Sequence, residues 1–305
     1  MKLSDALKPL KKTKRPVRIR IGHTYPRRIE AGYAADLRKM VKVISEEVKV
    51  SVMPALKAEL QARDFRMDSA DVPRIPFVDN LVRYDDANAD VGIMTQPDPE
   101  RLDGLADVLG IIRRLLSNLF PGQSLAERYA AETYASNEKD IAKAITNSLG
   151  ISVALPGGDS QLLNAWIVDN TSMIEDLQGT YLRRIQRSIS DGFVKGLRYE
   201  EIAKQIQKDT DISWRRAKNI ARDQVGTLNA MVTKERNAEL GVDEFIWRTM
   251  RDERVRGNPG GRYPNARPSH WAREGQKYSW KSGANGEFPG TPILCRCYAE
   301  SVIEI

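Results

Sequence analysis

The chain has 305 residues, of which 41% are hydrophobic and 29% are charged, and its net charge is +7. This length allows two domains, and no apolar run approaches the roughly 18 residues that a membrane-spanning helix needs. We therefore expect a globular protein without a membrane-spanning helix. The N-terminus has no apolar core of signal-peptide length, so we expect no export by that route.

The positive charge is concentrated at the N-terminus. Residues 1–28 hold ten basic residues, one acidic residue and three prolines, which gives a net charge of +9, and they lack a helical apolar stripe. We therefore predict an extended basic arm. It suits a polyanion, most often nucleic acid, but a solvated tail that only aids solubility fits equally well. The arm residues expected at a nucleic-acid or acidic-partner contact are Lys11, Lys12, Lys14, Arg15, Arg18, Arg20, Arg27 and Arg28.

Apolar residues at helical spacing follow the arm. In residues 30–65 they recur at steps of three or four, which predicts an amphipathic helix that Pro54 kinks or divides. Residues 68–100 are rich in Asp, Asn and Pro, and we expect mostly loop there. Further helices are predicted over residues 101–119, 124–135, 137–148, 159–170, 172–191, 199–206 and 213–240.

Local signals set several of these helix boundaries. Ser124, with Glu127 three residues later, has the pattern of a capping box, and Ser213 is a second candidate N-cap. The run Pro156–Asp159 predicts a break, and Gly241 suits the position just after the last helix. We interpret the apolar stripes as helix-packing core.

The helical period ends after Gly241. Residues 245–250 are a short β-type run, residues 257–268 form a loop rich in Gly, Pro and Asn, and residues 294–305 can supply one or two closing strands. The predicted fold is mainly α, with a large helical region, a small α+β C-terminal domain and an extended basic N-terminal arm. The expected parts are the arm (1–28), a helical region (29–156), a second helical region (157–241) and the C-terminal domain (242–305).

Three of the four His and Cys residues of the chain lie in the C-terminal domain. His270, Cys295 and Cys297, with Asp252 as a fourth ligand, are a mix that tetrahedral zinc accepts. In an extended strand the two thiols would point the same way about 6–7 Å apart, so zinc would need a bend at Arg296. Two cysteines this close do not easily form an unstrained disulfide, which favours a reducing compartment such as the cytoplasm.

Packing is the alternative to zinc. Both cysteines would then lie in a small core beside Trp247 and Trp280, and His270 would be hydrogen-bonded to Asp252. The aromatic residues Tyr263, Trp271, Tyr278 and Trp280 are expected to pack in the core, with base stacking as the other interpretation.

The charged string that follows residue 251 also has several interpretations. Asp252, Arg254 and Arg256 can form a charge-assisted structural network, and a phosphate-binding role is the alternative. Asp252 with His270 can also be a general acid/base pair. However, the sequence shows neither a nucleophile in a strand–turn–helix elbow nor a phosphate-binding glycine loop.

Several motifs follow one another from about residue 160 onward. In chain order they are Gly192–Ala203, Ala217–Gln224, Asn229, Trp247, Asp252–Arg256, His270, Gly275 and Cys295–Cys297. In this order they resemble the phage Mu protein F-like minor head proteins, also called phage head morphogenesis proteins. The chain departs from that family at Arg222–Gln224, where Arg-Thr-Glu is usual, and in the long spacer 257–267. It also lacks a Cys-x-x-Cys that some members carry.

The resemblance implies a minor structural protein of a tailed-phage head, and not an enzyme. Such a protein would act in capsid assembly and head morphogenesis at the portal vertex, and its partners would be the portal protein and capsid or scaffold proteins. Some relatives are thought to accompany DNA, which the basic arm would suit. We expect it in the virion, in the head interior or at the portal vertex, and in the host cytoplasm during assembly.

Two other functions stay open from the sequence. One is a metal-dependent nuclease or hydrolase that uses Asp252, His270, Cys295 and Cys297, with zinc as the expected metal. The other is a free DNA-binding factor that depends on residues 1–28.

Overall fold

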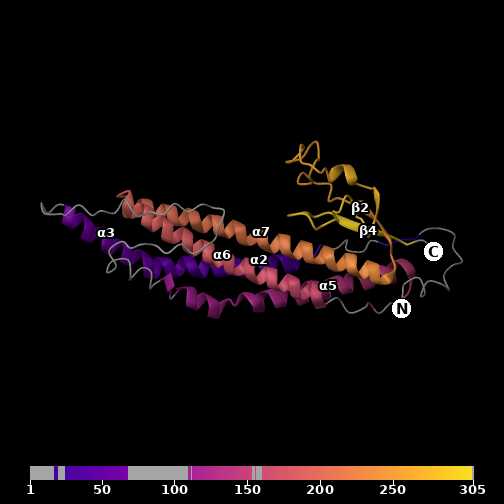
Figure 1. The fold of residues 1–305 in the computed structure, drawn as a ribbon, viewed down its shortest axis with the longest axis horizontal. Helices are drawn as coiled ribbons and strands as arrows, with labels where there is room; N and C mark the ends of the chain where they lie inside the picture. Colours follow the sequence, from indigo (N-terminus) through magenta and orange to yellow (C-terminus); the bar gives the residue numbers. More distant parts are fainter. Residues whose placement is uncertain are drawn as a thin grey trace. The chain divides into compact units, whose positions relative to one another are not determined.

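The computed structural model describes residues 17–19, 25–67, 109–110, 112–152, 155 and 160–303. Its elements (Figure 1) are β1 (Val17–Ile19), α2 (Arg27–Glu47), the π-helix η2 (Val48–Val52), α3 (Met53–Met67), α5 (Gly122–Leu149), α6 (Ser160–Val194), α7 (Tyr199–Leu240), β2 (Glu244–Arg248), the 3₁₀ helix η3 (Trp271–Arg273), β3 (Lys277–Ser279) and β4 (Tyr298–Ile303). Residues 109–110 and 112–119 are also helical. The predicted fold class, mainly α with a small α+β C-terminal part, is confirmed.

Several predicted segments lie outside the described residues. They are most of the N-terminal arm, the loop 68–100, the start of the helix predicted at 101–119 and the break at Pro156–Asp159. Among the described residues, every helix is too short or too polar to span a bilayer.

The chain forms two compact units. The first takes its residues from 1–37, 122–174 and 217–305, and the second from 38–121 and 175–216. Helices α2, α6 and α7 each contribute residues to both units. The C-terminal sheet and the candidate site belong to the first unit.

The helices are longer than the sequence predicts. Helix α5 replaces the pair predicted at 124–135 and 137–148, α6 replaces the next pair, and α7 runs through the predicted gap before residue 213. Ser213, predicted as an N-cap, is only 3% exposed inside α7, and α5 begins at Gly122 instead of at Ser124. Cap-type residues offer the backbone an alternative to the helix, but packing of a continuous apolar stripe overrides that local preference.

Pro54, predicted to kink or divide the helix, lies beside a change of helix type while the backbone stays helical. Helix α2 ends at Glu47, the five-residue η2 follows, and α3 begins at Met53. Because proline lacks a backbone N–H and its ring collides with the preceding turn, it fits near the start of a helix and not in its interior. A π-turn directly before it widens the helix locally.

Buried polar groups join α5 to α7 in the first unit. The Asn137 amide donates to Asn229 Oδ1 at 2.9 Å and to Thr233 Oγ1 at 2.8 Å. The guanidinium of Arg236, which is 0% exposed, donates to Asn137 Oδ1 at 3.1 Å and lies 4.2 Å above the Tyr134 ring. Since each buried polar group needs its partner, this network fixes the register of the two helices.

An aromatic contact brings α2 into the same unit. The rings of Tyr33 and Tyr129 are stacked with centroids 4.4 Å apart, and the Tyr33 hydroxyl donates to Asn170 on α6. The Asn170 amide in turn donates to Gln224 Oε1 on α7 at 3.0 Å. This chain of contacts links the four helices α2, α5, α6 and α7 through side chains far apart in the sequence.

In the second unit, α6 and α7 form an antiparallel hairpin (Figure 1). The hydroxyl of Ser188 donates to Asp209 Oδ2 at 2.6 Å, and the Tyr181 hydroxyl lies 2.5 Å from Thr210 Oγ1. Helix α7 lies close to Gly192 of α6, where an added Cβ would lie 2.5 Å from Ile202 Cδ1. The glycine is therefore needed for the close approach of the two helices.

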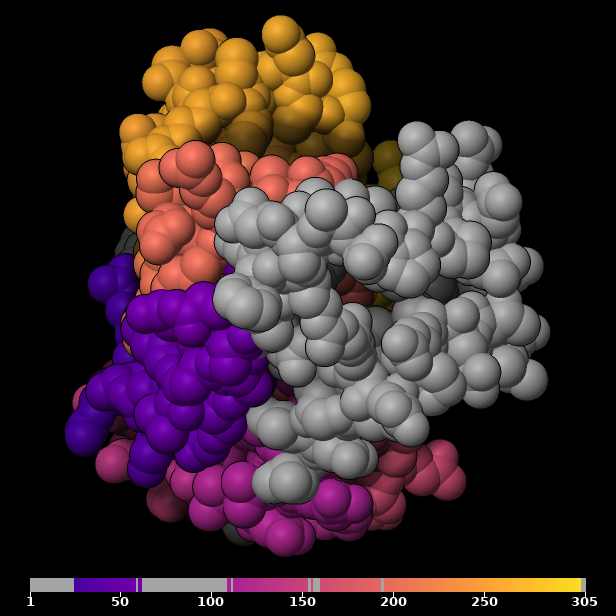
Figure 2. Space-filling view, turned by 90° about the vertical axis from the view of Figure 1, so that its left-hand side faces the viewer, coloured from indigo at the N-terminus to yellow at the C-terminus, as the bar shows by residue number. Residues whose placement is uncertain are grey.

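Four antiparallel strands form one sheet in the order β1-β4-β2-β3. Trp247 of β2 is opposite Ala299 of β4, and Arg18 of β1 is opposite Val302. Residues 17–19 of the predicted arm are thus extended, as expected, but they are paired as an edge strand. Residues around position 250, orange in Figure 2, form a compact body at the top of that view.

We predict that Gly192→Ala destabilises the protein. The added methyl group must displace Ile202, which for overpacking of a core costs about 1–3 kcal/mol. Chemical denaturation followed by circular dichroism measures the change. The matched control is Gly179→Ala in the same helix, where the new Cβ meets only the end of the Arg183 side chain at 3.1 Å. The control should be neutral or stabilising by up to about 1 kcal/mol; equal stability gains for both variants would contradict the packing described above.

Candidate functional site

The strand β4 directly follows Cys295 and Cys297, and its two faces have different partners. Cys297, Ala299 and Ser301 alternate along one face and are at most 9% exposed. The Ser301 hydroxyl donates to Asn237 Oδ1 of α7 at 2.7 Å. Glu300, on the other face, accepts a hydrogen bond from Arg248 Nε at 2.8 Å. The strand is therefore held against the helices on one side and by an ion pair on the other.

An aromatic core lies under this sheet. The rings of Phe245 and Trp280 are 4.4 Å apart, and Trp280 stacks on Phe288 at 6.2 Å. The buried members of the core are Ile141, Ile145, Leu240, Val242, Phe245, Trp247, Trp280, Ala284, Cys297 and Ala299. Cys297 lies in the core beside Trp247 and Trp280, as the packing interpretation expected.

The aromatic cluster predicted from the sequence is divided. Trp280 is buried, and Tyr278 packs against Phe245 with centroids 5.9 Å apart. Tyr263 is 55% exposed and Trp271 is 36% exposed. The prediction of core packing is therefore right for two of the four residues.

The loop that carries His270 is held by backbone hydrogen bonds. Trp271 N donates to Arg256 O at 3.0 Å, and Gly275 N donates to Trp247 O at 2.8 Å. Gly257 has a φ of 76°, and a Cβ added there would lie 2.5 Å from Ser269 Cβ. Only glycine permits both this backbone conformation and this close approach. The result is that His270 is presented from a fixed position.

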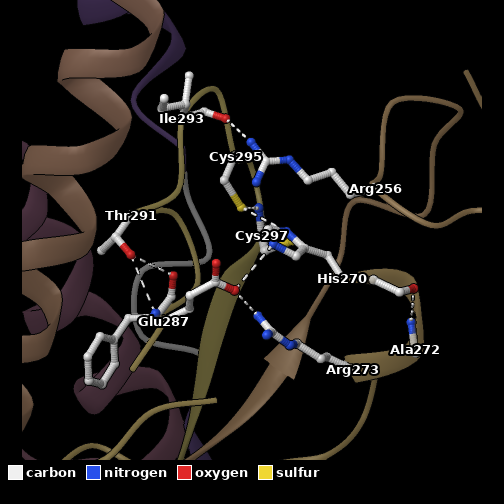
Figure 3. Close-up of polar contacts among 11 residues, drawn as sticks. Arg256, His270, Ala272, Arg273, Glu287, Thr291, Ile293, Cys295 and Cys297 are labelled. Atoms are coloured by element: carbon white, nitrogen blue, oxygen red, sulfur yellow. Dashed lines mark hydrogen bonds and ion pairs between the residues drawn. The ribbon is translucent and has the colours of Figure 1, made fainter. Parts of the chain in front are cut away.

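His270, Cys295 and Cys297 come together in one cluster (Figure 3). His270 Nδ1 lies 3.5 Å from Cys295 Sγ and 3.7 Å from Cys297 Sγ. These three atoms all lie within 4.8 Å of one another, and His270 is only 2% exposed. The sequence prediction that these residues meet agrees with this geometry. Two thiols and an imidazole are ligands that zinc prefers.

The two thiols are closer than the extended-strand argument predicts. Residues 295–297 precede β4, and the chain turns at Leu294, whose φ is 55°. Leu294 N donates to Asp223 Oδ1 of α7 at 2.6 Å, and Cys295 N donates to Pro292 O at 2.8 Å. Because the pair lies at the end of a turn and not in a strand, the spacing of two strand rises does not apply.

Hydrogen bonds polarise the thiol pair. The hydrogen bond with Cys297 lowers the pKa of Cys295 against the opposing effect of burial, and His270 lowers it further. The same bond from Cys295, together with burial, raises the pKa of Cys297. Cys297 N also donates to Cys295 Sγ at 3.4 Å. Cys295 is therefore the better thiolate of the pair.

The other ring nitrogen of His270 faces a carboxylate. Nε2 lies 3.8 Å from Glu287 Oε2, which is too long for a hydrogen bond, and it has no hydrogen-bond partner in the described part of the chain. Glu287 forms an ion pair with Arg273 (Figure 3). The carboxylate is thus held in front of the histidine by a neighbouring arginine.

Asp252 does not join the cluster. Its carboxylate pairs with Arg296 and accepts from Arg254 N at 3.1 Å. The prediction of a hydrogen bond between Asp252 and His270 is therefore wrong. In the described part of the chain, His270 contacts the two thiols instead. The physical reason is that Arg296, between the cysteines, offers the carboxylate a charged partner.

The arginines of the Asp252–Arg256 string have separate roles. The backbone N–H of Arg254 donates a hydrogen bond to Asp252 Oδ1, whereas Arg256 Nη2 donates to Ile293 O at 2.6 Å. This string is a series of turns and not a strand. Arg256 thereby fastens the turn that precedes Cys295.

A second charge cluster lies near the site, and sequence reasoning missed it. Glu274 Oε2 accepts from Thr249 N at 2.6 Å and from Thr249 Oγ1 at 2.8 Å, and Glu274 Oε1 lies 2.9 Å from Arg251 and 3.3 Å from Arg248. Its partners are more than twenty residues away in the sequence. No local spacing signals such a cluster.

These contacts shift the ionisation of Glu274. Burial opposes the shift, but the hydrogen bonds from Thr249 and the charge of Arg251 lower the pKa of the Glu274 carboxyl. The pKa of Asp252 is lowered in the same way. Burial acts to raise this pKa, but the hydrogen bond from Arg296 lowers it. Both carboxylates are thus stabilised as anions.

The structure describes only three of the arm residues that were predicted to contact nucleic acid or an acidic partner. Arg27 and Arg28 lie exposed in the first turn of α2, and Arg18 lies in β1. Lys11, Lys12, Lys14, Arg15 and Arg20 lie outside the described residues.

Comparison with known proteins finds a family similar to the C-terminal part of the chain. Residues 183–300 match the family described as Phage Mu protein F like protein, which confirms the resemblance for this part. The chain is also similar to an uncharacterized protein of Haemophilus influenzae, with 27% identity over 187 residues. That match covers 60% of this chain and 39% of the relative. No solved structure matches the chain. Residues 183–300 are thus similar to the phage Mu protein F-like family.

We predict that Glu274 makes the stability of this domain depend on pH. Because its folded-state pKa is lowered, its contribution is fully present above the ordinary glutamate value of about 4.3 and is lost as the pH falls through the depressed value. Glu274→Gln should therefore lower the unfolding temperature at pH 7, and the gap to the wild type should shrink as the pH falls from about 5 to 3. Thermal unfolding across this range measures both effects.

The control for this prediction is Glu244→Gln. Its ion pair with Lys277 is 42% to 44% exposed, so its loss should change stability by less than about 1 kcal/mol. A gap between wild type and Glu274→Gln that stays constant down to pH 3 would contradict the account of the Glu274 charge cluster.

Proposed function

We propose that this protein is a minor structural protein of a tailed-phage head that acts in head morphogenesis and is not an enzyme. The observation that carries the proposal is the match of residues 183–300 to the phage Mu protein F-like family. The match to the relative from Haemophilus influenzae covers 39% of that protein, so it supports a role for the matched part alone.

The charges around the His–Cys cluster support a structural role. A general base must be free to take a proton within hydrogen-bond reach of its substrate. Here Glu287 is paired with Arg273, and Asp252 is paired with Arg296. Both carboxylates hold neighbouring loops in place. Neither carboxylate is therefore free to act as a general base in this arrangement.

We place the protein at the portal vertex or in the head interior of the virion, and in the host cytoplasm during assembly. Its proposed partners are the portal protein and capsid or scaffold proteins. The support is the head-protein character of the matched family.

The proposed contact with DNA rests on the basic arm. Residues 1–28 carry a net charge of +9, and β1 anchors this arm to β4 of the domain. A polycation fixed to a folded domain can neutralise phosphates while the domain is docked elsewhere. We therefore propose that the arm contacts DNA or an acidic assembly partner.

The composition and assembly of purified phage heads test the proposed head role directly. We expect mass spectrometry of purified heads to find this protein at low copy beside the portal protein, and heads made without its gene to be defective in assembly. Absence from purified heads, with normal heads made without the gene, would overturn the proposal. Metal-dependent plasmid cleavage by the purified protein that is lost in His270→Ala would favour the nuclease alternative instead.

We predict that neutralising the arm weakens DNA binding in a salt-dependent way. Each lost phosphate contact reduces the slope of log affinity against log salt by about 0.9. Four arm substitutions to Gln should therefore flatten the slope by about 3 to 4 in fluorescence anisotropy with duplex DNA. The substituted residues are Lys11, Lys12, Lys14 and Arg15.

The matched control removes the same charge from exposed helix positions. These positions are Lys139, Lys143, Lys204 and Lys208, all substituted by Gln. The control should keep most of the salt slope of the wild type. If both quadruple variants lose binding equally, DNA recognition is a property of overall charge and not of the arm.

A further inference from the structure

We propose that His270, Cys295 and Cys297 bind one Zn²⁺ through Nδ1 and two thiolates, with a water molecule as the fourth ligand. This site would join the loop after β2 to the turn before β4. The inference goes beyond the head role and does not depend on it.

The distances between the ligand atoms fit a tetrahedral ion. With Zn–S of about 2.3 Å and Zn–N of about 2.1 Å, tetrahedral angles place a nitrogen and a sulfur about 3.6 Å apart. The two Sγ atoms lie 3.5 Å and 3.7 Å from His270 Nδ1. All three atoms lie within 4.8 Å of one another. The side chains thus surround one common point and need little movement to bind an ion.

The ligand chemistry selects the metal. Two thiolates with an imidazole favour zinc over magnesium or calcium, which prefer oxygen ligands. Cys297 is 9% exposed and His270 is 2% exposed, so ionised thiols there need compensating positive charge. Zn²⁺ supplies that charge, and the N–H of Cys297 already donates to Cys295 Sγ at 3.4 Å.

The unpartnered nitrogen of His270 is an independent observation for the same site. A metal-bound histidine commonly directs its other ring N–H at a carboxylate, which fixes the tautomer and the ring orientation. In this structure Nε2 is buried without a hydrogen-bond partner and faces Glu287 at 3.8 Å. Metal binding at Nδ1 would place the proton on Nε2, where a small movement of Glu287 completes the hydrogen bond.

The fourth position is assigned to water because the nearby acidic group is engaged. Asp252 is paired with Arg296 and does not lie in the ligand group. A recess lined in part by Arg254, Arg256 and Leu294 opens beside the cysteines and the histidine. Solvent can therefore reach the ion from this side.

Metal content of the wild type is the first test. The full chain is purified without a histidine tag and without chelator. Inductively coupled plasma mass spectrometry should then find about one zinc ion per chain. With Co²⁺ in place of zinc, a thiolate-to-metal charge-transfer band should appear in the wild type and be nearly lost in Cys295→Ser or Cys297→Ser, because these variants bind little metal. Fewer than about 0.1 zinc per chain, even after equimolar zinc is added, would overturn the proposal.

Variants identify the ligands. His270→Asn, Cys295→Ser and Cys297→Ser should each lower bound zinc at least tenfold. Asp252→Asn is the matched control and should keep it; loss of zinc in Asp252→Asn would overturn the ligand set.

A measurement on the wild type guards against variants that fail to fold. Both cysteines should resist alkylation in the native protein and react after a strong chelator removes the metal, because a coordinated thiolate is blocked from attack. Equal alkylation rates before and after chelation would contradict the site.

Discussion

The burial of β4 on both faces is the constraint on which the C-terminal domain depends. One face places Cys297, Ala299 and Ser301 against the helices, and the other places Glu300 beside Arg248. A sheet with strands of only three to six residues cannot hide enough apolar surface alone. It is stable here because α7 and α5 supply the rest of its core and Asn237 anchors the strand.

This constraint explains why a loop-rich segment can present chemistry at fixed positions. The residues between β2 and β4 contain little regular structure, yet their backbone groups bond to Trp247, Arg256 and Asp243. Side chains add further contacts. Glu274 accepts a hydrogen bond from Thr249 and forms ion pairs with Arg248 and Arg251, and Arg256 donates to the turn before Cys295. Such a frame of contacts holds the backbone and the side chains of this segment in one arrangement.

Local patterns predicted the elements of the fold, and long-range contacts decided the rest. The stripe in residues 30–65, the change of helix type beside Pro54 and the strand near residue 245 all follow from spacing and from proline chemistry. The continuity of α7 through Ser213 does not, because packing overrides a capping preference. The proximity of His270 to the cysteines was foreseen from residue types, whereas the pairing of Asp252 with Arg296 was not, since sequence separation gives no measure of which charge is nearest.

Hydrogen exchange of the full chain tests most directly whether residues 242–303 are one folded body. The account predicts that the amides of Trp271 and Gly275 in the loop exchange with the same opening free energy as those of Trp247 and Ala299 in the strands. Such a result would identify a single cooperative unit. Loop amides that exchange orders of magnitude faster than the strand amides would contradict the account, because the His–Cys cluster would then lack a rigid frame.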